Sequence, residues 1–354
     1  ALLSGHAYGE VCRVFDTRYT VSDEIRLPPG TYRSLTGNKA IALAMATAAR
    51  QTGAKVFLGS YPITPATDIL HNAVELAHFN ITALQAEDEI AGICSAIGAA
   101  FGGSLAVTTT SGPGMALKSE AIGLAVMTEL PLLIIDVQRG GPSTGMPTKT
   151  EQSDLLQAVY GRNGECPVAV IAPRSPFDCF ATTLEALRIA TRYMTPVIML
   201  TDGGIANATE IGPVPVLDEL PPFELEFRTE PAGFQVYGRD GRLARDWVRP
   251  GTPGLEHRIG GLEKDALSGD VSMDGANHDQ MVRTRAQKIA GIARDYPSVP
   301  VEGDPGAKLL VIGWGGTYGS IAEAVRHCNA EEIPVAHVHL RHLNPLPDDL
   351  GDIL

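Results

Sequence analysis

The fold is decided by a stretch that begins with Gly59-Ser60-Tyr61-Pro62-Ile63-Thr64-Pro65, continues through Gln85-Ala86-Glu87 and closes on Asp136-Val137-Gln138-Arg139-Gly140-Gly141. Each of these segments comes directly after a predicted β-strand. In an open α/β sheet, ligands bind in the crevice outside the carboxyl ends of the strands. We therefore expect the Thr64 hydroxyl, the Glu87 carboxylate and the Arg139 guanidinium to face one crevice.

Short apolar strands alternate with helices on both sides of this stretch. Strands are expected at 55–59, 82–85, 105–109, 132–137, 168–172 and 197–201, and helices at 40–51, 67–77, 87–101, 117–128, 151–159 and 176–192. This alternation predicts βαβ units and a parallel sheet covered on both faces, which is a doubly wound α/β domain. Asn38 is expected to cap the first helix, Gly53 to end it, and Thr64 or Thr67 to cap the second. The helix at 87–101 is apolar almost all round, so we expect it to be buried.

Breaks in this pattern predict the domain organisation. Residues 1–35 have no clean periodicity, although a short strand at 11–19 is compatible with the sequence, and we interpret them as a linker or the tail of a preceding domain. The first α/β domain takes residues 36–211. Residues 212–304 are an irregular, proline-rich connector with one helix at 280–295. A second α/β domain begins at 305 with a strand at 308–313, a helix at 320–328 and a strand at 335–340, and the chain ends too soon to complete it.

Composition argues against several classes of protein. The formal net charge of −13 argues against a nucleic-acid partner, because phosphate backbones are bound by basic surfaces. The five cysteines contain no C-x-x-C pair, so we expect this chain to hold neither an iron–sulfur cluster nor a metal ion by itself. Their scattered spacing is typical of a reduced cytoplasmic protein. No apolar run is long enough to span a membrane, and residues 1–10 do not resemble a signal peptide.

Three motifs carry a resemblance to a known family: Tyr61-Pro62-Ile63-Thr64-Pro65, Gln85-Ala86-Glu87 and Arg139-Gly140-Gly141-Pro142-Ser143-Thr144-Gly145-Met146-Pro147-Thr148. In order and spacing they resemble the α subunits of 2-oxoacid:ferredoxin oxidoreductases, above all the 2-oxoglutarate type, from about residue 37 onward. The resemblance implies that residues 36–211 are a pyrimidine-type thiamine diphosphate-binding domain. It implies a second domain of the transketolase C-terminal type, and Tyr61, Pro62 and Ile63 as cofactor contacts.

Glu87 is the first candidate catalytic residue. The simplest alternative is a carboxylate stabilised by the dipole of the helix that follows. However, Glu87, Asp88 and Glu89 are consecutive, so we expect one of them to point inward, where a carboxylate needs a partner. The resemblance implies that Glu87 hydrogen-bonds the aminopyrimidine ring of thiamine diphosphate and promotes its imino tautomer.

Thr64 and Arg139 are the other candidate catalytic residues. Thr64 lies between two prolines on a restricted backbone, and it could cap a helix. The resemblance implies that its hydroxyl contacts the oxoacid or takes part in the chemistry on the pyrimidine side of the cofactor. Arg139 ends an apolar strand, where its forked donors fit a carboxylate, and the alternative is a pair with Asp136 or Glu151. The resemblance implies that Arg139 binds the substrate C1 carboxylate.

The loop after Arg139 supplies two further substrate-binding candidates. Thr148 matches a family residue that helps to hold the oxoacid. Lys149 could reach the distal carboxylate of a dicarboxylic oxoacid, although a solvated loop lysine is the simpler interpretation. The segment 140–147 is flexible enough to close over a substrate, although many such loops only turn a corner.

Part of the expected cofactor site is missing from the sequence. Thiamine diphosphate enzymes hold the diphosphate through Mg²⁺ with a Gly-Asp-Gly motif, which does not occur here. The glycine-rich run from Gly313 to Ser320 follows a strand and could cradle a phosphate, but close packing of a strand–helix turn is favoured. The resemblance therefore implies a β subunit that holds the diphosphate, Mg²⁺ and a [4Fe-4S] cluster, in a dimer of αβ heterodimers.

The resemblance predicts the α subunit of a 2-oxoglutarate:ferredoxin oxidoreductase. This enzyme converts 2-oxoglutarate and coenzyme A into succinyl-CoA and CO₂ and reduces ferredoxin, with thiamine diphosphate in a shared site. One alternative is a pyruvate or broad-specificity 2-oxoacid enzyme of the same class. The other is a non-catalytic α/β subunit that binds a nucleotide or serves assembly.

Overall fold

The computed structural model describes residues 1–12, 27–304 and 306–354. Contacts between residues divide the chain into two units, Ala1–Tyr32 and Arg33–Leu354. The first unit contains helix α1 (Leu2–Cys12), which the sequence did not predict. Val11 and Cys12 belong to this helix and not to the strand expected at 11–19, the rest of which lies outside the described residues.

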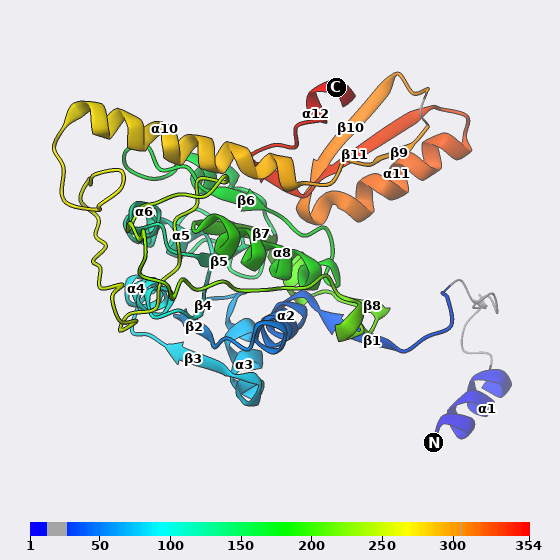
Figure 1. The fold of residues 1–354 in the computed structure, drawn as a ribbon. Coiled ribbons are helices and arrows are strands. Elements are labelled where there is room, and N and C mark those ends of the chain that lie inside the picture. Colours follow the sequence, from blue (N-terminus) through cyan, green and yellow to red (C-terminus); the bar gives the residue numbers. More distant parts are fainter. Residues whose placement is uncertain (13–26, 305) are drawn as a thin grey trace. The chain divides into compact units, whose positions relative to one another are not determined.

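A seven-stranded sheet forms the centre of the second unit (Figure 1). Its order is β12-β6-β7-β5-β4-β2-β3, formed by β2 (Val56–Ser60), β3 (Ile81–Gln85), β4 (Leu105–Thr110), β5 (Leu132–Gln138), β6 (Ala169–Ile171), β7 (Pro196–Asp202) and β12 (His342–Asn344). The strands from β2 to β7 are parallel, as predicted, and every residue of β4, β5 and β7 is buried. β12, which was not predicted, pairs antiparallel with β6 at one edge.

The direction of winding changes at β2. Val56 of β2 lies opposite Ile81 of β3 on one side and opposite Leu105 of β4 on the other. In doubly wound sheets, ligands bind at such a switch point, outside the carboxyl ends of the strands. The ends of β2 and β4 are joined there, because the Ser60 hydroxyl donates to the Thr109 carbonyl at 3.1 Å. The segment 61–65 leaves the sheet at this point.

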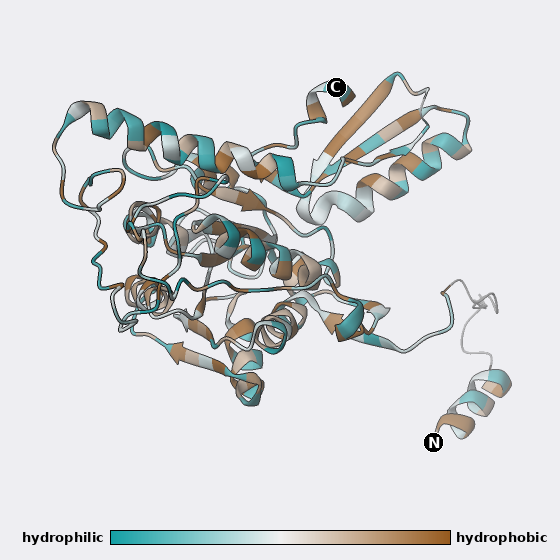
Figure 2. Cartoon of the chain, in the orientation of Figure 1, coloured by the Kyte–Doolittle hydropathy of each residue, from teal (hydrophilic) through white to brown (hydrophobic). Residues whose placement is uncertain are grey.

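Helices cover both faces of the sheet, which confirms the doubly wound α/β class. Each face has its own hydrophobic cluster, and Figure 2 shows hydrophobic colour along the central strands. The helices are α2 (Gly37–Thr52), α3 (Thr67–Glu75) and α8 (Asp178–Tyr193) on one face, and α4 (Glu89–Phe101), α5 (Gly112–Leu117), α6 (Ser119–Thr128) and α7 (Leu155–Tyr160) on the other. Two short helices, η1 (Ala77–Phe79) and α9 (Gly203–Asn207), complete this part.

Helix α4 packs directly on β2 because Gly59 has no side chain. A Cβ atom at residue 59 would overlap the Ser95 hydroxyl and the Gly92 carbonyl. The opposite side of α4 is open, with Ile90 47% exposed and Cys94 exposed, so the expectation that this helix is buried all round is wrong. Its apolar sequence reflects one packed face and one exposed apolar face.

Several helix ends differ from the predicted caps. Thr36 caps α2 by accepting from the Lys39 N–H at 3.3 Å, whereas Asn38 is buried and donates to the Pro65 carbonyl at 2.9 Å. Gly53 ends α2 with φ of 68°, as predicted. Neither Thr64 nor Thr67 caps α3, which begins after Ala66.

Residues 212–304 contain more ordered structure than the sequence predicted. β8 (Thr209–Pro213) pairs with β1 (Tyr32–Thr36), and the connector then passes through η2 (Leu217–Glu219) to α10 (Gly275–Gly291) and η3 (Ile292–Asp295). Helix α10 begins before the predicted residue 280 because Asp274 caps it, accepting from the Asn277 N–H at 2.8 Å.

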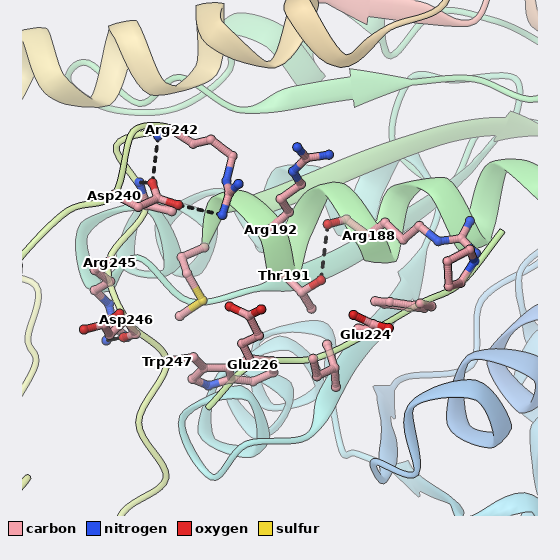
Figure 3. A pocket seen from close by; sticks show the side chains of 15 residues that line it. Arg188, Thr191, Arg192, Glu224, Glu226, Asp240, Arg242, Arg245, Asp246 and Trp247 are labelled. Carbon is pink, nitrogen blue, oxygen red and sulfur yellow. Dashed lines mark hydrogen bonds and ion pairs between the residues drawn. The ribbon is translucent and has the colours of Figure 1, made fainter. Parts of the chain in front are cut away.

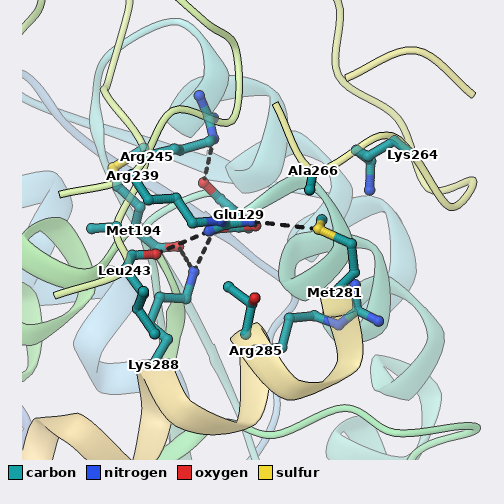
Figure 4. Close-up of polar contacts among 12 residues, drawn as sticks. Glu129, Met194, Arg239, Leu243, Arg245, Lys264, Ala266, Met281, Arg285 and Lys288 are labelled. Carbon is teal, nitrogen blue, oxygen red and sulfur yellow. Dashed lines mark hydrogen bonds and ion pairs between the residues drawn. The ribbon is translucent and has the colours of Figure 1, made fainter. Parts of the chain in front are cut away.

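A buried group of charges, the Glu129 cluster (Glu129, Arg239, Arg245 and Lys288), fastens this connector to the sheet domain (Figure 4). Glu129, 1% exposed at the end of α6, accepts from both terminal nitrogens of Arg239 at 2.6 and 2.7 Å and from Lys288 Nζ at 2.6 Å. The Arg245 Nε donates to the Glu129 carbonyl at 3.1 Å. Burial alone would raise the pKa of Glu129, but the neighbouring Lys288 and Arg239 outweigh it and lower the pKa to about 2.

A small second sheet follows the connector. It has the order β10-β11-β9 and consists of β9 (Val301–Gly303), β10 (Leu309–Trp314) and β11 (Val335–Leu340), with η4 (Gly315–Thr317) and α11 (Tyr318–Ala330) between β10 and β11. The parallel β10–α11–β11 unit is the second α/β element that the sequence predicted. The chain then returns to the large sheet as β12 and ends in α12 (Leu350–Ile353). The domain boundaries at 36, 211 and 304 stay predictions.

Candidate active site

The carboxyl ends of β2, β3 and β5, at one edge of the sheet, carry the predicted motifs. The Ala86 N–H, directly after β3, donates to the Ser60 carbonyl of β2 at 2.8 Å, so the turn that carries Glu87 is fixed to the start of the segment 61–65. Arg139, directly after β5, reaches the same segment and donates through Nη1 to the Thr64 carbonyl at 2.6 Å. Thr64 is thus tied to Arg139, and Glu87 lies one strand away from the Thr64 segment.

Glu87 is exposed, and no hydrogen-bond donor for its carboxylate is found within the described ranges 27–304 and 306–354. It does not open α4, as the sequence suggested, because Asp88 is the N-cap and accepts from the Ala91 N–H at 2.6 Å. The two adjacent acids therefore differ in function within the fold. Asp88 caps helix α4, whereas the Glu87 carboxylate is exposed at the carboxyl end of β3. The expectation of an inward, partnered carboxylate does not apply to Glu87.

Arg139 is 6% exposed and bonds to backbone rather than to an acid. Besides the Thr64 carbonyl, it donates through Nη2 to the Thr144 carbonyl at 3.1 Å, while its buried Nε has no partner among the described residues. Neither of the two ion pairs considered from sequence forms. Glu151 accepts from the Gly141 N–H at 3.0 Å, and Asp136 lies against another carboxyl group.

The loop from residue 140 to 153 is closed at its base. The Gly140 N–H donates to the Lys149 carbonyl at 2.9 Å, and the Met146 N–H donates to the Gly140 carbonyl at 2.8 Å. Every residue from 141 to 150 is exposed, including Thr148 and Lys149. This loop therefore presents both predicted side chains to solvent beside Arg139.

A pair of acids, Asp136 and Asp154, lies at the base of this loop and was not predicted from the sequence. Asp136 is fully buried in β5, and its carboxyl group lies against that of Asp154, which is 8% exposed and precedes α7. Burial and the nearby Asp154 raise the pKa of Asp136 well above its usual value, and burial also raises the pKa of Asp154. A single acidic residue inside an apolar strand was the signal in the sequence, because Asp is rarely fully buried without a partner.

Lys118 is a second buried charge that the sequence analysis missed. Its ammonium donates to the Glu89 carbonyl at 2.7 Å and to the Thr108 hydroxyl at 3.3 Å, and it is fully buried between α5 and α6. Burial lowers its pKa to about 8. Through Glu89, Lys118 holds the first turn of α4, directly after the residue pair Glu87 and Asp88.

The glycine-rich run at 313–320 forms a closely packed turn. The Gly316 N–H donates to Asp202, which also accepts from Gly204 and Ile205 at 2.8 and 2.9 Å. A Cβ at Gly316 would lie 2.5 Å from the Asp202 carboxylate, and His339 contacts the Gly315 carbonyl at 3.1 Å. These contacts fit the packing interpretation that was favoured from the sequence.

Two other hollows lie apart from the predicted catalytic side chains. One, of about 1000 Å³, is lined by residues 150–152, the start of α8 and the turn at 316–319. The other, of about 320 Å³, lies between α8 and the connector, where arginines and acids alternate around Trp247 (Figure 3). Within the described residues, no cluster of three or more His, Cys, Asp or Glu side chains could hold a metal ion. In the same parts of the chain, no helix is long and apolar enough to cross a bilayer.

Known proteins resemble this chain over most of its length. Residues 47–272 match the family model described as pyruvate flavodoxin/ferredoxin oxidoreductase, thiamine diphosphate-binding. The chain is 58% identical to the 2-oxoglutarate oxidoreductase subunit KorA of Mycobacterium tuberculosis over 356 aligned residues, covering 100% of this chain and 54% of that protein. It is 34% identical to the 2-oxoglutarate synthase subunit KorA of Archaeoglobus fulgidus, covering 83% of this chain and 77% of that protein. The chain thus spans about half the length of the first of these relatives.

A solved structure shares the same fold. It is the 2-oxoglutarate:ferredoxin oxidoreductase from Magnetococcus marinus with 2-oxoglutarate, coenzyme A and succinyl-CoA bound. The TM-score is 0.88 at 34% identity, and the match covers 99% of this chain and 60% of that one.

Proposed function

We propose, from the premise that this chain belongs to the pyruvate flavodoxin/ferredoxin oxidoreductase family, that it is the α subunit of a 2-oxoglutarate:ferredoxin oxidoreductase. The reaction would be the reversible conversion of 2-oxoglutarate and coenzyme A into succinyl-CoA and CO₂, with electrons passed to ferredoxin. The observation that carries the proposal is that Arg139, after β5, bonds the Thr64 carbonyl after β2, while the exposed Glu87 follows the neighbouring strand β3. The names of the similar proteins support 2-oxoglutarate as the oxoacid.

The crevice residues fit the pyrimidine part of thiamine diphosphate. The Glu87 carboxylate, with no donor among the described residues, is free to accept a hydrogen bond from a ring N–H and to exchange a proton with it. Tyr61 is 36% exposed, and Pro62 and Ile63 are partly exposed, so all three can contact the ring. When bound, thiamine diphosphate supplies the electron sink for decarboxylation.

The substrate would be held by the residues on either side of Arg139. Arg139 uses one N–H of each terminal nitrogen on a backbone carbonyl, so its remaining N–H groups are available for the C1 carboxylate. The Thr64 and Thr148 hydroxyls would contact the same end of the oxoacid, and Lys149 would reach its distal carboxylate. The bonds from Arg139 to Thr64 and Thr144 keep these elements in one place before a substrate arrives.

A partner subunit completes the proposed site. The two KorA relatives named above are subunits. Apolar side chains of β3, α4 and α5 are exposed, with Leu84 41%, Ile90 47% and Leu117 52% exposed. We propose that a β subunit covers this surface and contributes Mg²⁺, the diphosphate contacts and a [4Fe-4S] cluster, in a dimer of αβ heterodimers that reduces ferredoxin. We expect this assembly in the cytoplasm, because the scattered cysteines resemble those of reduced proteins.

An oxoacid panel tests the proposal. The α chain, alone and co-purified with its β subunit, would be assayed with 2-oxoglutarate, pyruvate and branched-chain oxoacids, coenzyme A and a one-electron acceptor dye. We expect turnover of 2-oxoglutarate by the complex and none by the isolated chain. A preference for pyruvate would show that pyruvate, and not 2-oxoglutarate, is the substrate. Turnover by the isolated chain would contradict the proposal that the site is shared with a β subunit. A complex without bound thiamine diphosphate would indicate a non-catalytic subunit.

A further inference from the structure

The Asp136–Asp154 pair supports an inference that deepens the proposed function and rests on it. Among the described residues, no donor bonds to either carboxyl oxygen of Asp136 or to Oδ2 of Asp154. Two carboxyl groups in contact can satisfy each other only when one of them is protonated and donates. The pair therefore retains one proton, and Asp136, whose pKa is raised well above its usual value, is the group that holds it.

The surroundings of the pair offer no compensating charge within the described residues. Thr110 of β4 and Leu200 of β7 lie opposite Asp136 in the sheet, and neither ionises. The start of α5 is close as well, because a Cβ at Gly112 would lie 2.9 Å from Asp154 Oδ2. The charged neighbour that acts on Asp154 is Glu151, which is also acidic. A shared proton is thus the means by which this pair avoids two buried negative charges.

The pair lies where the loop 140–153 returns to the sheet. The Asp154 N–H donates to Gln138 Oε1 at 3.1 Å, and Gln138 Nε2 donates to the Thr201 carbonyl of β7 at 3.0 Å. Arg139, the next residue, holds the other side of the loop through the Thr144 carbonyl. The last residues of β5 therefore fasten the loop from both sides.

We propose that Asp136 and Asp154 are positioning residues for oxoacid binding, because their proton-sharing hydrogen bond holds the loop 140–153 where Thr148 can meet a substrate bound at Arg139. Neither acid touches the substrate. Folded Asp136 binds its proton more tightly than the unfolded chain does, so the attachment is complete below about pH 4 and weakens as the pH rises through the pKa of the buried pair.

Three variants separate this role from a general effect on stability. Asp136→Asn replaces the protonated acid with an amide that donates to Asp154 and has no proton to lose. Asp154→Ala removes the partner and leaves Asp136 alone. Asp279→Asn, at an exposed pair with Arg283 on α10, is the matched control for loss of a carboxylate. In the αβ complex, we expect Asp154→Ala to raise KM for the oxoacid and lower kcat/KM about tenfold, the order expected for one hydrogen bond to a charged group. We expect Asp136→Asn to lack the fall in kcat/KM that the wild type shows as the pH rises through the pKa of the buried pair, because the amide has no proton to lose.

Tryptic cleavage after the exposed Lys149, followed by mass spectrometry on the full chain without partner or substrate, provides a readout independent of activity. The rate for the wild type, divided by the rate for Asp136→Asn at the same pH, is expected to rise with pH as the buried pair ionises, and in this ratio the pH dependence of trypsin cancels. If Asp154→Ala does not fold, this ratio still decides. Identical cleavage profiles for wild type and Asp136→Asn would overturn the positioning role even in an active enzyme. The expected profiles without any oxoacid turnover would support the loop attachment and count against the proposed function.

Discussion

The crevice and the Glu129 cluster use charged side chains in opposite ways. Glu87 is exposed without a donor among the described residues, and Arg139 bonds only to backbone carbonyls. Glu129 is 1% exposed and is bonded by Arg239 and Lys288. A buried charge is tolerated only when it is paired, whereas a charge at a strand end can stay unpaired and available. The difference indicates that the cluster fixes the connector, and it agrees with the proposal that the crevice groups bind a ligand.

Replacing Glu87 tests the crevice side of this comparison with the largest expected effect. Glu87→Gln keeps the shape of the side chain and removes the carboxylate. Because general acid–base groups typically contribute ~10²–10⁴-fold, we expect kcat of the complex to fall by about that factor. The melting temperature should not change, since no interaction within the described chain is lost. A variant with near-normal kcat would reduce Glu87 to a surface charge.

Replacing Glu129 tests the other side. Glu129→Gln leaves Arg239 and Lys288 buried without a counter-charge, so we expect the free energy of unfolding to fall by about 3–5 kcal/mol. Activity per folded molecule should change little. Glu323→Gln is the matched control, because Glu323 pairs with Arg326 and His327 on the surface and its loss should leave the melting temperature unchanged. Equal effects of the two substitutions would show that the cluster does not fasten the connector.

Arg139 holds two backbone segments together and is also proposed to bind the substrate carboxylate. The substitution Arg139→Lys tests which of these two roles is the more important. Lysine keeps the charge but loses the planar fork, so it cannot bond the Thr64 and Thr144 carbonyls and a carboxylate together. We expect kcat/KM for the oxoacid to fall by about 10- to 150-fold, the equivalent of one charged hydrogen bond. A lower melting temperature with unchanged kcat/KM would assign Arg139 to the scaffold instead.

The smallest expected effect is the acid response of the Glu129 cluster. The pKa of Glu129 is about 2 in the folded chain, below the value of about 4.3 for an unfolded glutamate. The contribution of the ionised Glu129 carboxylate to stability is therefore complete above about pH 4.3. That contribution is lost as the pH falls towards 2. Urea denaturation at pH 6, 4 and 3 should therefore show a loss in the wild type that is smaller in Glu129→Gln. Parallel curves would mean that other carboxylates dominate the acid response.

Local sequence patterns predicted the sheet domain well. Short, mostly apolar runs bounded by turns identified β2 to β7. The expectation that Thr64 and Arg139 share one end of the sheet agrees with the bond from Arg139 to the Thr64 carbonyl. β12 escaped prediction because it is a short edge segment, fixed by pairing with β6 rather than by its own composition. The start of α10 was missed although Asp274 is a standard capping residue, since the prolines before it suggested continued irregularity.

Charge pairing over long sequence distances could not be predicted in the same way. Glu129 is 110 residues from Arg239 and 159 residues from Lys288, and no local pattern connects them. The environment of Glu87 was also misjudged, because three consecutive acids do not reveal which one caps the helix, and Asp88 does so. The catalytic and binding roles of Thr64, Glu87, Arg139 and Thr148 stay predictions until the variants are measured.

The missing side chain at Gly59 sets the spacing between the two walls of the crevice. Because α4 rests on bare backbone there, the Glu87 turn and the Thr64 segment keep their separation through contact of main chains. A methyl group at residue 59 would act as a wedge between strand and helix. It would shift one wall against the other without altering any of the predicted site residues. The separation of the two walls thus depends on the absence of a side chain at residue 59.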